Sequence, residues 1–230
     1  MKVLAIDVGG THIKLLASGR RTPIKIDSGP TMTASDMVRL VKQVTREWTY
    51  DVVSIGYPGP VVLGRPLREP FNLGPGWVRF DFARAFGKPV KVINDAAMQA
   101  LGSYEGGRML FLGLGTGLGT ATVHDGHVDS LEIGHLPFRN GRSYEDYLGN
   151  HGLRKLGRRK WERCVLEVVA LLRDAFIADY VVLGGGNSKL LRRLPPRTKR
   201  GDNANAFVGA FRLWRAPGTT PRLLRRQRVS

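Results

Sequence analysis

A chain of 230 residues with 42% hydrophobic side chains has enough apolar material for one compact domain or two small lobes. It has no apolar run of the roughly 20 residues that a membrane-spanning helix requires, and its single cysteine, Cys164, excludes an internal disulfide framework. These features favour a globular protein of the cytoplasm without a membrane partner.

The net charge of +17 is concentrated in the C-terminal part of the chain. Residues 154–163 carry six Lys and Arg against one Glu, and residues 189–230 carry twelve against one Asp, so the remainder is almost neutral. Such a concentration indicates a polyanionic partner: nucleic acid, an anionic membrane surface or a phosphate polymer. The alternative is a solvated basic face followed by a loose tail, and for residues 219–230 we favour the tail.

The N-terminal stretch predicts a β-hairpin with a glycine-rich tip. Apolar runs precede and follow Asp7-Val-Gly-Gly-Thr11, which places glycines where the turn needs positive φ or close backbone approach. Residues 23–26 would add a third strand. Further along, residues 33–36 predict the start of a helix whose apolar residues recur at helical spacing over 37–48. The patterns then predict a strand over 51–56, a long loop over 64–77, a helix over 80–86, a strand over 90–93 and a helix over 96–104.

The second half repeats this order. A second hairpin over 109–123 has the tip Gly113-Leu-Gly-Thr-Gly117, and a strand over 128–132 follows it. We expect helices over 143–147, 161–178 and 203–214, with a strand at 180–184 that ends on Gly184-Gly-Gly186. Because the order of a β-meander followed by helices occurs twice, the sequence predicts an α/β fold of two similar lobes around a cleft.

The two glycine-tipped turns suggest a clamp for phosphate. Backbone N–H groups that glycines leave accessible, together with threonine hydroxyls, suit an anion held from both sides. The alternative is that both are ordinary tight turns of core hairpins.

Taken in order, the motifs resemble those of a known family. Asp7-Val-Gly-Gly-Thr11, Asn94-Asp95-Ala96, Gly113-Leu-Gly-Thr-Gly117, Glu132-Ile-Gly-His135 and Gly184-Gly-Gly186 are similar to the ROK sugar kinases of the actin-like ATPase superfamily, and Asn72-Leu-Gly-Pro-Gly-Trp77 to their polyphosphate glucokinases. The resemblance implies a two-lobed actin-like (ribonuclease H-like) fold with duplicated β-meanders around a central cleft. We expect an N-terminal lobe at 1–106, a C-terminal lobe at 107–216 and a disordered basic tail at 217–230.

The resemblance also implies roles for individual residues. Asp95 would be the catalytic base, accepting the proton of a sugar hydroxyl; its alternative is a helix N-cap. Asp7 would act on Mg²⁺ through water, and Lys14 is as readily a solvated strand residue as a phosphate ligand. The phosphates would be bound by Asp7, Gly9, Gly10, Thr11, Gly115, Thr116 and Gly117, the sugar by Asn72, Asn94, Asp95, Glu132, His135 and Glu145, and the nucleotide side would be formed by Gly184, Gly185 and Gly186.

The implied reaction is transfer of a phosphoryl group from polyphosphate, ATP or both to the 6-hydroxyl of glucose, by a homodimer with Mg²⁺ as cofactor. Many ROK proteins bind zinc through a histidine and three cysteines, but residues 139–144 hold no cysteine, so we expect no zinc. Phe71 stands where the family commonly has a polar residue, which affects sugar specificity.

Four alternatives remain open. The chain could be a strictly ATP-dependent hexokinase or mannokinase, a sugar-sensing regulator, a non-catalytic sugar-binding relic, or a nucleic-acid-binding protein. A regulator would need a helix-turn-helix before residue 1, and the basic segments lack the interleaved aromatic residues of specific nucleic-acid binding. We therefore expect no specific nucleic-acid partner.

Overall fold

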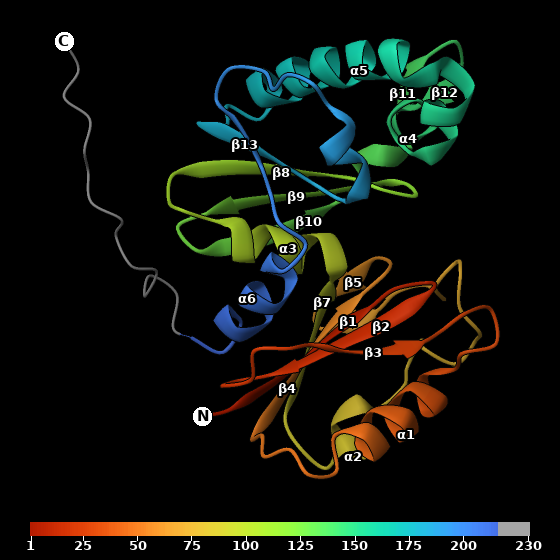
Figure 1. The fold of residues 1–230 in the computed structure, drawn as a ribbon, viewed down its shortest axis with the longest axis vertical. Helices are drawn as coiled ribbons and strands as arrows, with labels where there is room; N and C mark the ends of the chain where they lie inside the picture. Colours follow the sequence, from red (N-terminus) through yellow and green to blue (C-terminus); the bar gives the residue numbers. More distant parts are fainter. Residues whose placement is uncertain (216–230) are drawn as a thin grey trace.

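A computed structural model describes residues 1–215; the predicted tail over 217–230 lies outside them. The described chain forms two lobes, each built on a five-stranded sheet (Figure 1). The strand order is β3-β2-β1-β4-β7 in the first sheet and β10-β9-β8-β13-β14 in the second. In both, an antiparallel meander of three strands is extended by two parallel strands. The predicted α/β fold with a duplicated meander is confirmed.

The first lobe places two helices on one face of its sheet. Helix α1 begins because the Thr33 side chain accepts a hydrogen bond from the backbone N–H of Asp36, and α2 ends at Gly87, which has left-handed backbone. The strands are β1 (Val3–Val8), β2 (His12–Ala17), β3 (Ile24–Asp27), β4 (Val52–Tyr57) and β7 (Val90–Asn94), with β5 (Val61–Val62) and β6 (Arg65–Pro66) as a small separate hairpin, and the helices are α1 (Ala34–Val44) and α2 (Phe82–Phe86).

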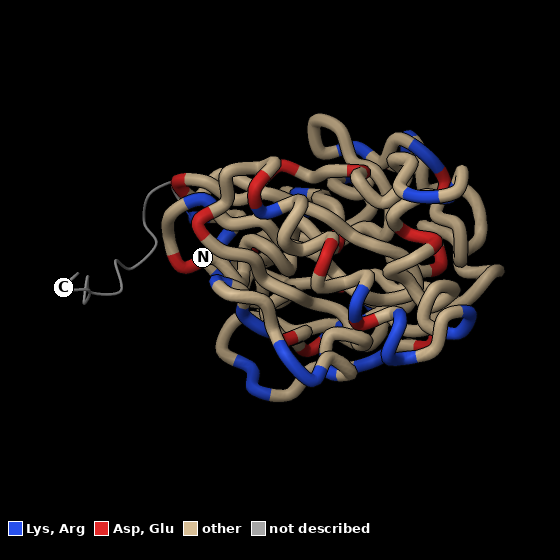
Figure 2. The backbone as a smooth tube through the Cα atoms, turned by 90° about the horizontal axis from the view of Figure 1, so that it is seen from above, with Lys and Arg blue, Asp and Glu red and all other residues tan. Residues whose placement is uncertain are grey.

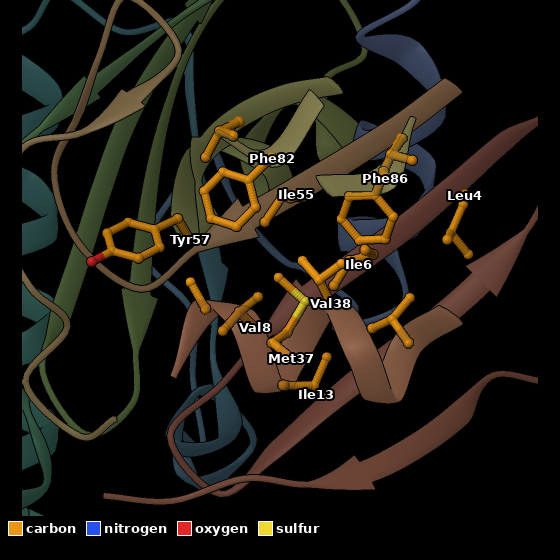
Figure 3. Packing of buried hydrophobic residues seen from close by; sticks show 14 of the residues in the cluster. Leu4, Ile6, Val8, Ile13, Met37, Val38, Ile55, Tyr57, Phe82 and Phe86 are labelled. Carbon is orange, nitrogen blue, oxygen red and sulfur yellow. The ribbon is translucent and has the colours of Figure 1, made fainter. Parts of the chain in front are cut away.

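Alternating apolar residues of the first sheet face these helices and form a core. Ile6, Ile13 and Ile55 are fully buried, and Met37 of α1 and Phe86 of α2 pack against the same face (Figure 3). Burial of such side chains contributes roughly 1.5–3 kcal/mol each, so this face fixes the direction of β1, β4 and β7. The candidate site lies at the carboxyl ends of these three strands.

The second lobe repeats the arrangement with one long helix. Helix α5 covers the second sheet through a stripe of fully buried side chains that includes Trp161, Val165 and Val169. The strands are β8 (Arg108–Leu114), β9 (Leu118–His124), β10 (His127–Leu131), β13 (Tyr180–Gly184) and β14 (Thr198–Arg200), with β11 (Pro137–Arg139) and β12 (Arg142–Ser143) as a separate pair; the helices are η1 (Ile133–His135), α4 (Tyr144–Leu148), α5 (Asn150–Ala175) and η2 (Gly186–Leu190).

Two helices lie between the lobes: α3 (Asp95–Ser103) and α6 (Asn205–Arg212). They cross at small residues, because a Cβ on Gly102 would collide with the Asn205 carbonyl and one on Gly209 with the Met98 carbonyl. Helix α3 also contacts β9 and β4, so it touches both sheets. The close crossing therefore fixes α3, and with it the residues at its N-terminus, relative to both lobes.

Several elements differ from the sequence predictions. The helix expected over 161–178 begins earlier, at Asn150, with a non-helical Gly157 (φ 71°) inside it, because glycine adopts this backbone without steric cost. Strand β14 and helix η2 were not predicted, since neither carries a clear apolar period. Within residues 1–215, no helix combines the length and apolar character needed to cross a membrane.

Candidate active site

A cleft of about 450 Å³ lies between the two lobes, where β1, β7, β8 and the N-terminus of α3 meet. It brings together residues that are far apart in the sequence, including both glycine-tipped turns. Of the residues predicted for the site, the cleft is lined by Asp7, Gly9, Gly10, Asn72, Asn94, Asp95, Gly115, Thr116, Gly117, Glu132, Glu145 and Gly185. Among the described residues, the predicted Thr11, His135, Gly184 and Gly186 are not part of its lining.

The first turn joins β1 to β2. It is closed by a hydrogen bond from the Gly9 N–H to the His12 carbonyl, at 3.1 Å. A Cβ on Gly10 would come within 2.7 Å of the Asn72 Cβ, so glycine lets the predicted sugar-binding loop lie directly against this turn.

Asp7 and Lys14 form a pair beside this turn. They are directly opposite each other in the β1–β2 ladder, and the Lys14 Nζ lies 3.3 Å from the Asp7 Oδ2. Both residues line the cleft. Sequence reasoning left Lys14 open as a site residue; its register position opposite Asp7 was the signal that could have included it.

The second turn joins β8 to β9 and is closed by a hydrogen bond from the Gly115 N–H to the Gly117 carbonyl, at 3.1 Å. The backbone N–H of Asn150, the first residue of α5, donates to the carbonyls of Gly115 and Thr116, both at 3.1 Å. The Asn187 side-chain amide also donates to the Gly115 carbonyl, at 3.2 Å. The turn is therefore held from behind by α5 and η2.

Each turn leaves backbone donors free. Across residues 1–215, the N–H groups of Gly10, Thr11, Thr116 and Gly117 have no protein acceptor. A concave set of such donors in a glycine-rich turn binds anions, and phosphate oxygens are suitable acceptors. Three of these four residues, Gly10, Thr116 and Gly117, line the cleft, so the turns offer backbone donors from opposite lobes.

Asp95 stands at the first position of α3, directly after β7. The helix N-cap is the preceding residue, Asn94, whose Oδ1 accepts from the Ala97 N–H at 3.0 Å. The Asp95 carboxylate accepts a hydrogen bond from the neighbouring Ala96 N–H, at 2.8 Å. The N-cap role considered for Asp95 therefore belongs to Asn94, and the Asp95 carboxylate remains directed to the cleft.

Two glycines allow the close approach of α3 to both sheets. A Cβ on Gly56 of β4 would lie 3.5 Å from the Asp95 Cα and would overlap the Met98 side chain. A Cβ on Gly119 of β9 would lie 2.7 Å from the Ala96 Cβ. Larger residues at either position would push the N-terminus of α3, and therefore the Asp95 carboxylate, out of place.

The environment of Asp95 favours its protonated form. Burial raises the pKa of Asp95 from 3.8 to about 7, and the negative charges of Asp7 and then of Glu132 add to the increase, whereas backbone hydrogen bonds from Ala96 and from its own N–H oppose it. A carboxyl group with a pKa near neutrality is suited to accept a proton at physiological pH. A pKa raised by burial in a cleft is also typical of functional sites.

The residues predicted to bind the sugar come from both lobes, and three of them, Glu132, His135 and Glu145, lie on the second. The Glu145 Oε2 accepts from the Leu118 N–H at 3.1 Å, and α4 carries Glu145 in its first turn behind a Ser143–Asp146 capping box. The Glu132 Oε2 lies 3.3 Å from the His135 Nε2. His135 therefore contacts a residue of the cleft without lining the cleft itself. Both polar atoms of the Asn94 side chain have hydrogen-bond partners: the Oδ1 accepts from the Ala97 N–H, and the Nδ2 donates to the Gly59 carbonyl at 3.1 Å.

The three glycines at and after the end of β13 differ in how much space surrounds them. A Cβ on Gly184 would overlap the Phe111 ring, Gly185 has φ 77° beside the Leu114 backbone, and Gly186 has open space around its Cα. Gln99 and Asn203 line the cleft and bond to each other, Nε2 to Oδ1, at 3.1 Å. Neither was predicted, because nothing in their local sequence distinguishes them from other polar residues.

Metal binding would depend on the carboxylates of the cleft. The Asp7 carboxylate is close enough to Asp95 for its negative charge to raise the pKa of Asp95. Hard oxygen donors of this kind suit Mg²⁺, which usually takes one or two carboxylates together with phosphate oxygens. Among the described residues, no three His, Cys, Asp or Glu side chains come together as an all-protein metal site. The residues therefore fit Mg²⁺ held jointly with a phosphate donor.

A larger cavity of about 930 Å³ lies elsewhere, along β7 between the β5–β6 hairpin and α2. It contains none of the predicted site residues and no cluster of acidic groups; Asp81 is its single carboxylate. The chemistry of the chain is therefore concentrated in the smaller cleft.

Comparison with known proteins places this geometry in a structural family. A glucomannokinase from Arthrobacter sp. strain KM, described as using inorganic polyphosphate or ATP, superposes with a TM-score of 0.77 at 23% identity, covering 91% of this chain and 96% of its own. A ROK-family glucokinase from Streptomyces griseus, solved with glucose and AMPPNP, gives 0.74 at 18% identity, covering 93% and 99%. The chain has the fold of the ROK-family sugar kinases.

Sequence comparison points in the same direction. A polyphosphate glucokinase from Mycobacterium leprae is 26% identical in an alignment of 212 positions that covers 84% of this chain. The chain spans only 62% of that relative's own length. No protein-family model matches the chain. The predicted resemblance to ROK sugar kinases and to polyphosphate glucokinases is confirmed.

Proposed function

We propose that the chain is a sugar kinase that transfers a phosphoryl group to the 6-hydroxyl of glucose, from polyphosphate, from ATP or from both. One observation carries the proposal: free backbone donors of two turns and a carboxyl group with a pKa near 7 line the same cleft. A phosphate clamp beside a general base is what phosphoryl transfer to an alcohol requires. Similarity to proteins named polyphosphate glucokinase and glucomannokinase supports this substrate class.

The reaction assigns a task to each group. Asp95 accepts the proton of the sugar hydroxyl while that oxygen forms a bond to the terminal phosphorus, and the bond from phosphorus to the rest of the donor breaks. The free N–H groups of the two turns hold the phosphate oxygens, and the Lys14 ammonium adds positive charge beside them. When bound, Mg²⁺ supplies charge neutralisation of the phosphates, and Asp7 is the residue that would hold it, through water.

Sugar recognition is assigned to the other polar residues of the cleft. Asn72, Glu132 and Glu145 offer amide and carboxylate groups to ring hydroxyls, and His135 supports Glu132. Such groups can discriminate hexoses strongly, because a missing partner leaves a buried polar group unpaired. The homodimer and the N- and C-terminal lobe boundaries at residues 106 and 107 stay predictions.

The deciding experiment is an assay of glucose 6-phosphate formation with polyphosphate and with ATP in parallel. Turnover with both donors, or with polyphosphate alone, supports the full proposal. Turnover with ATP alone would identify a strictly ATP-dependent hexose kinase and remove polyphosphate. Binding of glucose without turnover by either donor would identify a non-catalytic sugar-binding protein.

The pH dependence of the reaction follows from Asp95. Because its pKa is about 7 and the reactive form is the carboxylate, we expect kcat/KM to rise with pH and level off above about pH 7, with roughly one tenth of the plateau value at about pH 6. The measurement is kcat/KM for glucose from about pH 5.5 to about pH 9. A flat profile across this range would contradict the role of Asp95.

Removal of divalent metal should abolish activity reversibly. We expect EDTA to reduce turnover to background and Mg²⁺ to restore it, because the cleft supplies too few ligands to retain the cation without the phosphate donor. Elemental analysis of the purified protein should give no stoichiometric zinc. One zinc per chain would contradict this expectation.

A further inference from the structure

The second lobe carries a concentrated and uncompensated positive surface next to the cleft. We define the α5–η2 basic surface as the six Lys and Arg of residues 154–163 together with the three of residues 189–193. All nine side chains are exposed, and none forms an ion pair with a carboxylate in the part of the chain that the structure describes. Figure 2 shows Lys and Arg gathered in runs along the margin of the molecule.

The two segments of this surface are joined by specific contacts. The Arg158 Nε donates to the Leu190 carbonyl at 2.8 Å, which brings α5 against the end of η2. Glu162, the one acidic residue in these segments, accepts from the backbone N–H groups of Arg192 and Arg193. Its carboxylate therefore orders the backbone, and the guanidinium groups around it keep their charge available.

The surface is continuous with the donor end of the cleft. Asn187 in η2 donates to the carbonyl of Gly115 in the phosphate turn, at 3.2 Å, and to the Asn150 Oδ1, at 2.7 Å. Lys189 follows two residues later, and Arg154 lies one helical turn beyond Asn150 along α5. Both basic segments therefore start next to residues that hold the phosphate turn and lead away from the cleft along α5 and η2.

We infer that the α5–η2 basic surface binds the distal phosphates of a linear polyphosphate whose terminal phosphate occupies the cleft. This inference rests on the proposed function and adds a second, non-reacting binding region for the donor. Rows of Lys and Arg bind a linear polyanion by releasing its counterions, which makes the affinity strongly salt-dependent. Short donors would end before they reach this surface, so affinity should increase with chain length.

Nucleic acid is the competing occupant, and the surface is poorly suited to it. Single-stranded nucleic acid binds through aromatic stacking as well as charge. The only aromatic residue in either segment is Trp161, which is fully buried in the core of the second lobe. The surface therefore offers charge without a stacking platform.

The test compares two triple variants of the full chain. R154Q/K155Q/R159Q removes three exposed cations whose side chains have no hydrogen-bond partner among residues 1–215, and glutamine keeps the helix propensity. The matched control, R21Q/K25Q/R84Q, removes the same charge from exposed side chains of the first lobe that likewise have no hydrogen-bond partner among residues 1–215; the first lobe lies at the other end of the molecule from α5 (Figure 1). The readouts are equilibrium binding of long-chain polyphosphate over a salt series, and KM for long-chain polyphosphate, tripolyphosphate and ATP.

We expect the α5 variant to bind long-chain polyphosphate at least about tenfold more weakly, with the slope of log affinity against log salt reduced by about 2. Its KM for tripolyphosphate and for ATP should remain within about twofold of the unmodified chain, and the control variant should behave like that chain. Equal losses in both variants, or none, would overturn the inference. Tighter binding of a single-stranded RNA with the same number of phosphates would overturn it in favour of nucleic acid.

The binding readout separates this inference from the proposed function. If polyphosphate binding falls as expected while no donor supports glucose phosphorylation, the basic surface stands and the kinase proposal fails. If glucose is phosphorylated but chain length has no effect on KM or on binding, the kinase stands and the basic surface fails.

Discussion

Asp95→Asn should lower kcat for glucose phosphorylation by about 10²–10⁴-fold, the usual contribution of a general base. The amide still accepts the short hydrogen bond from the Ala96 N–H, so the N-terminus of α3 stays in place. It cannot take a proton from the sugar. We therefore expect the affinity for glucose, measured by calorimetry, to change by less than about threefold while turnover is lost.

The control for this substitution is Asp129→Asn. Asp129 is an exposed carboxylate on β10, outside the cleft lining, and its replacement removes the same charge from the same protein. Its activity should equal that of the unmodified chain. An Asp95→Asn variant that keeps more than a tenth of the activity would disprove the assignment of Asp95 as the base.

The same variant tests the burial of Asp95 through stability. Between about pH 4 and pH 7 the folded protein keeps the Asp95 proton that the unfolded chain has lost, so the stabilising contribution of this proton is lost as pH rises through 7. Asparagine removes the cost of an ionised carboxylate in that position. At about pH 8, Asp95→Asn should therefore melt about 5 °C higher than the unmodified chain, and the difference should disappear near pH 4.

Gly115→Ala should lower kcat/KM for every phosphoryl donor by more than about 100-fold while leaving the melting temperature unchanged. A Cβ at Gly115 meets no protein atom within 4 Å and its backbone is not left-handed, so alanine fits the free protein. The methyl group would instead stand in the cleft, where the donor phosphates must approach the turn. Loss of activity without loss of stability would therefore report contact with the donor.

Gly186→Ala is the matched comparison, because Gly186 also has open space and ordinary backbone. It lies outside the cleft lining, on the side that the resemblance to ROK kinases assigns to the nucleotide. We expect this variant to raise KM for ATP and to leave polyphosphate turnover intact. Normal activity of Gly115→Ala with both donors would show that the second turn does not contact the phosphates.

The sequence indicated much of the site because its chemistry lies in short contiguous patterns. An apolar run that enters Asp7-Val-Gly-Gly-Thr11 indicates a tight turn at a strand end, and Asn94-Asp95 similarly indicates the junction of a strand with a helix. Gln99 and Asn203 could not be recognised in this way. They meet only because α3 and the segment before α6 pack together, over a separation of more than a hundred residues.

By itself, the sequence determined most of the longer helices and strands, the two glycine-tipped turns and the concentration of positive charge, because these depend on residue type and near-neighbour spacing. Only the tertiary structure decided that both turns and Asp95 share one cleft, because that depends on the crossing of α3 and α6 and on the glycines that let α3 approach both sheets. It also decided the pKa of Asp95, which follows from burial and from the charges of Asp7 and Glu132, residues that are distant in the chain.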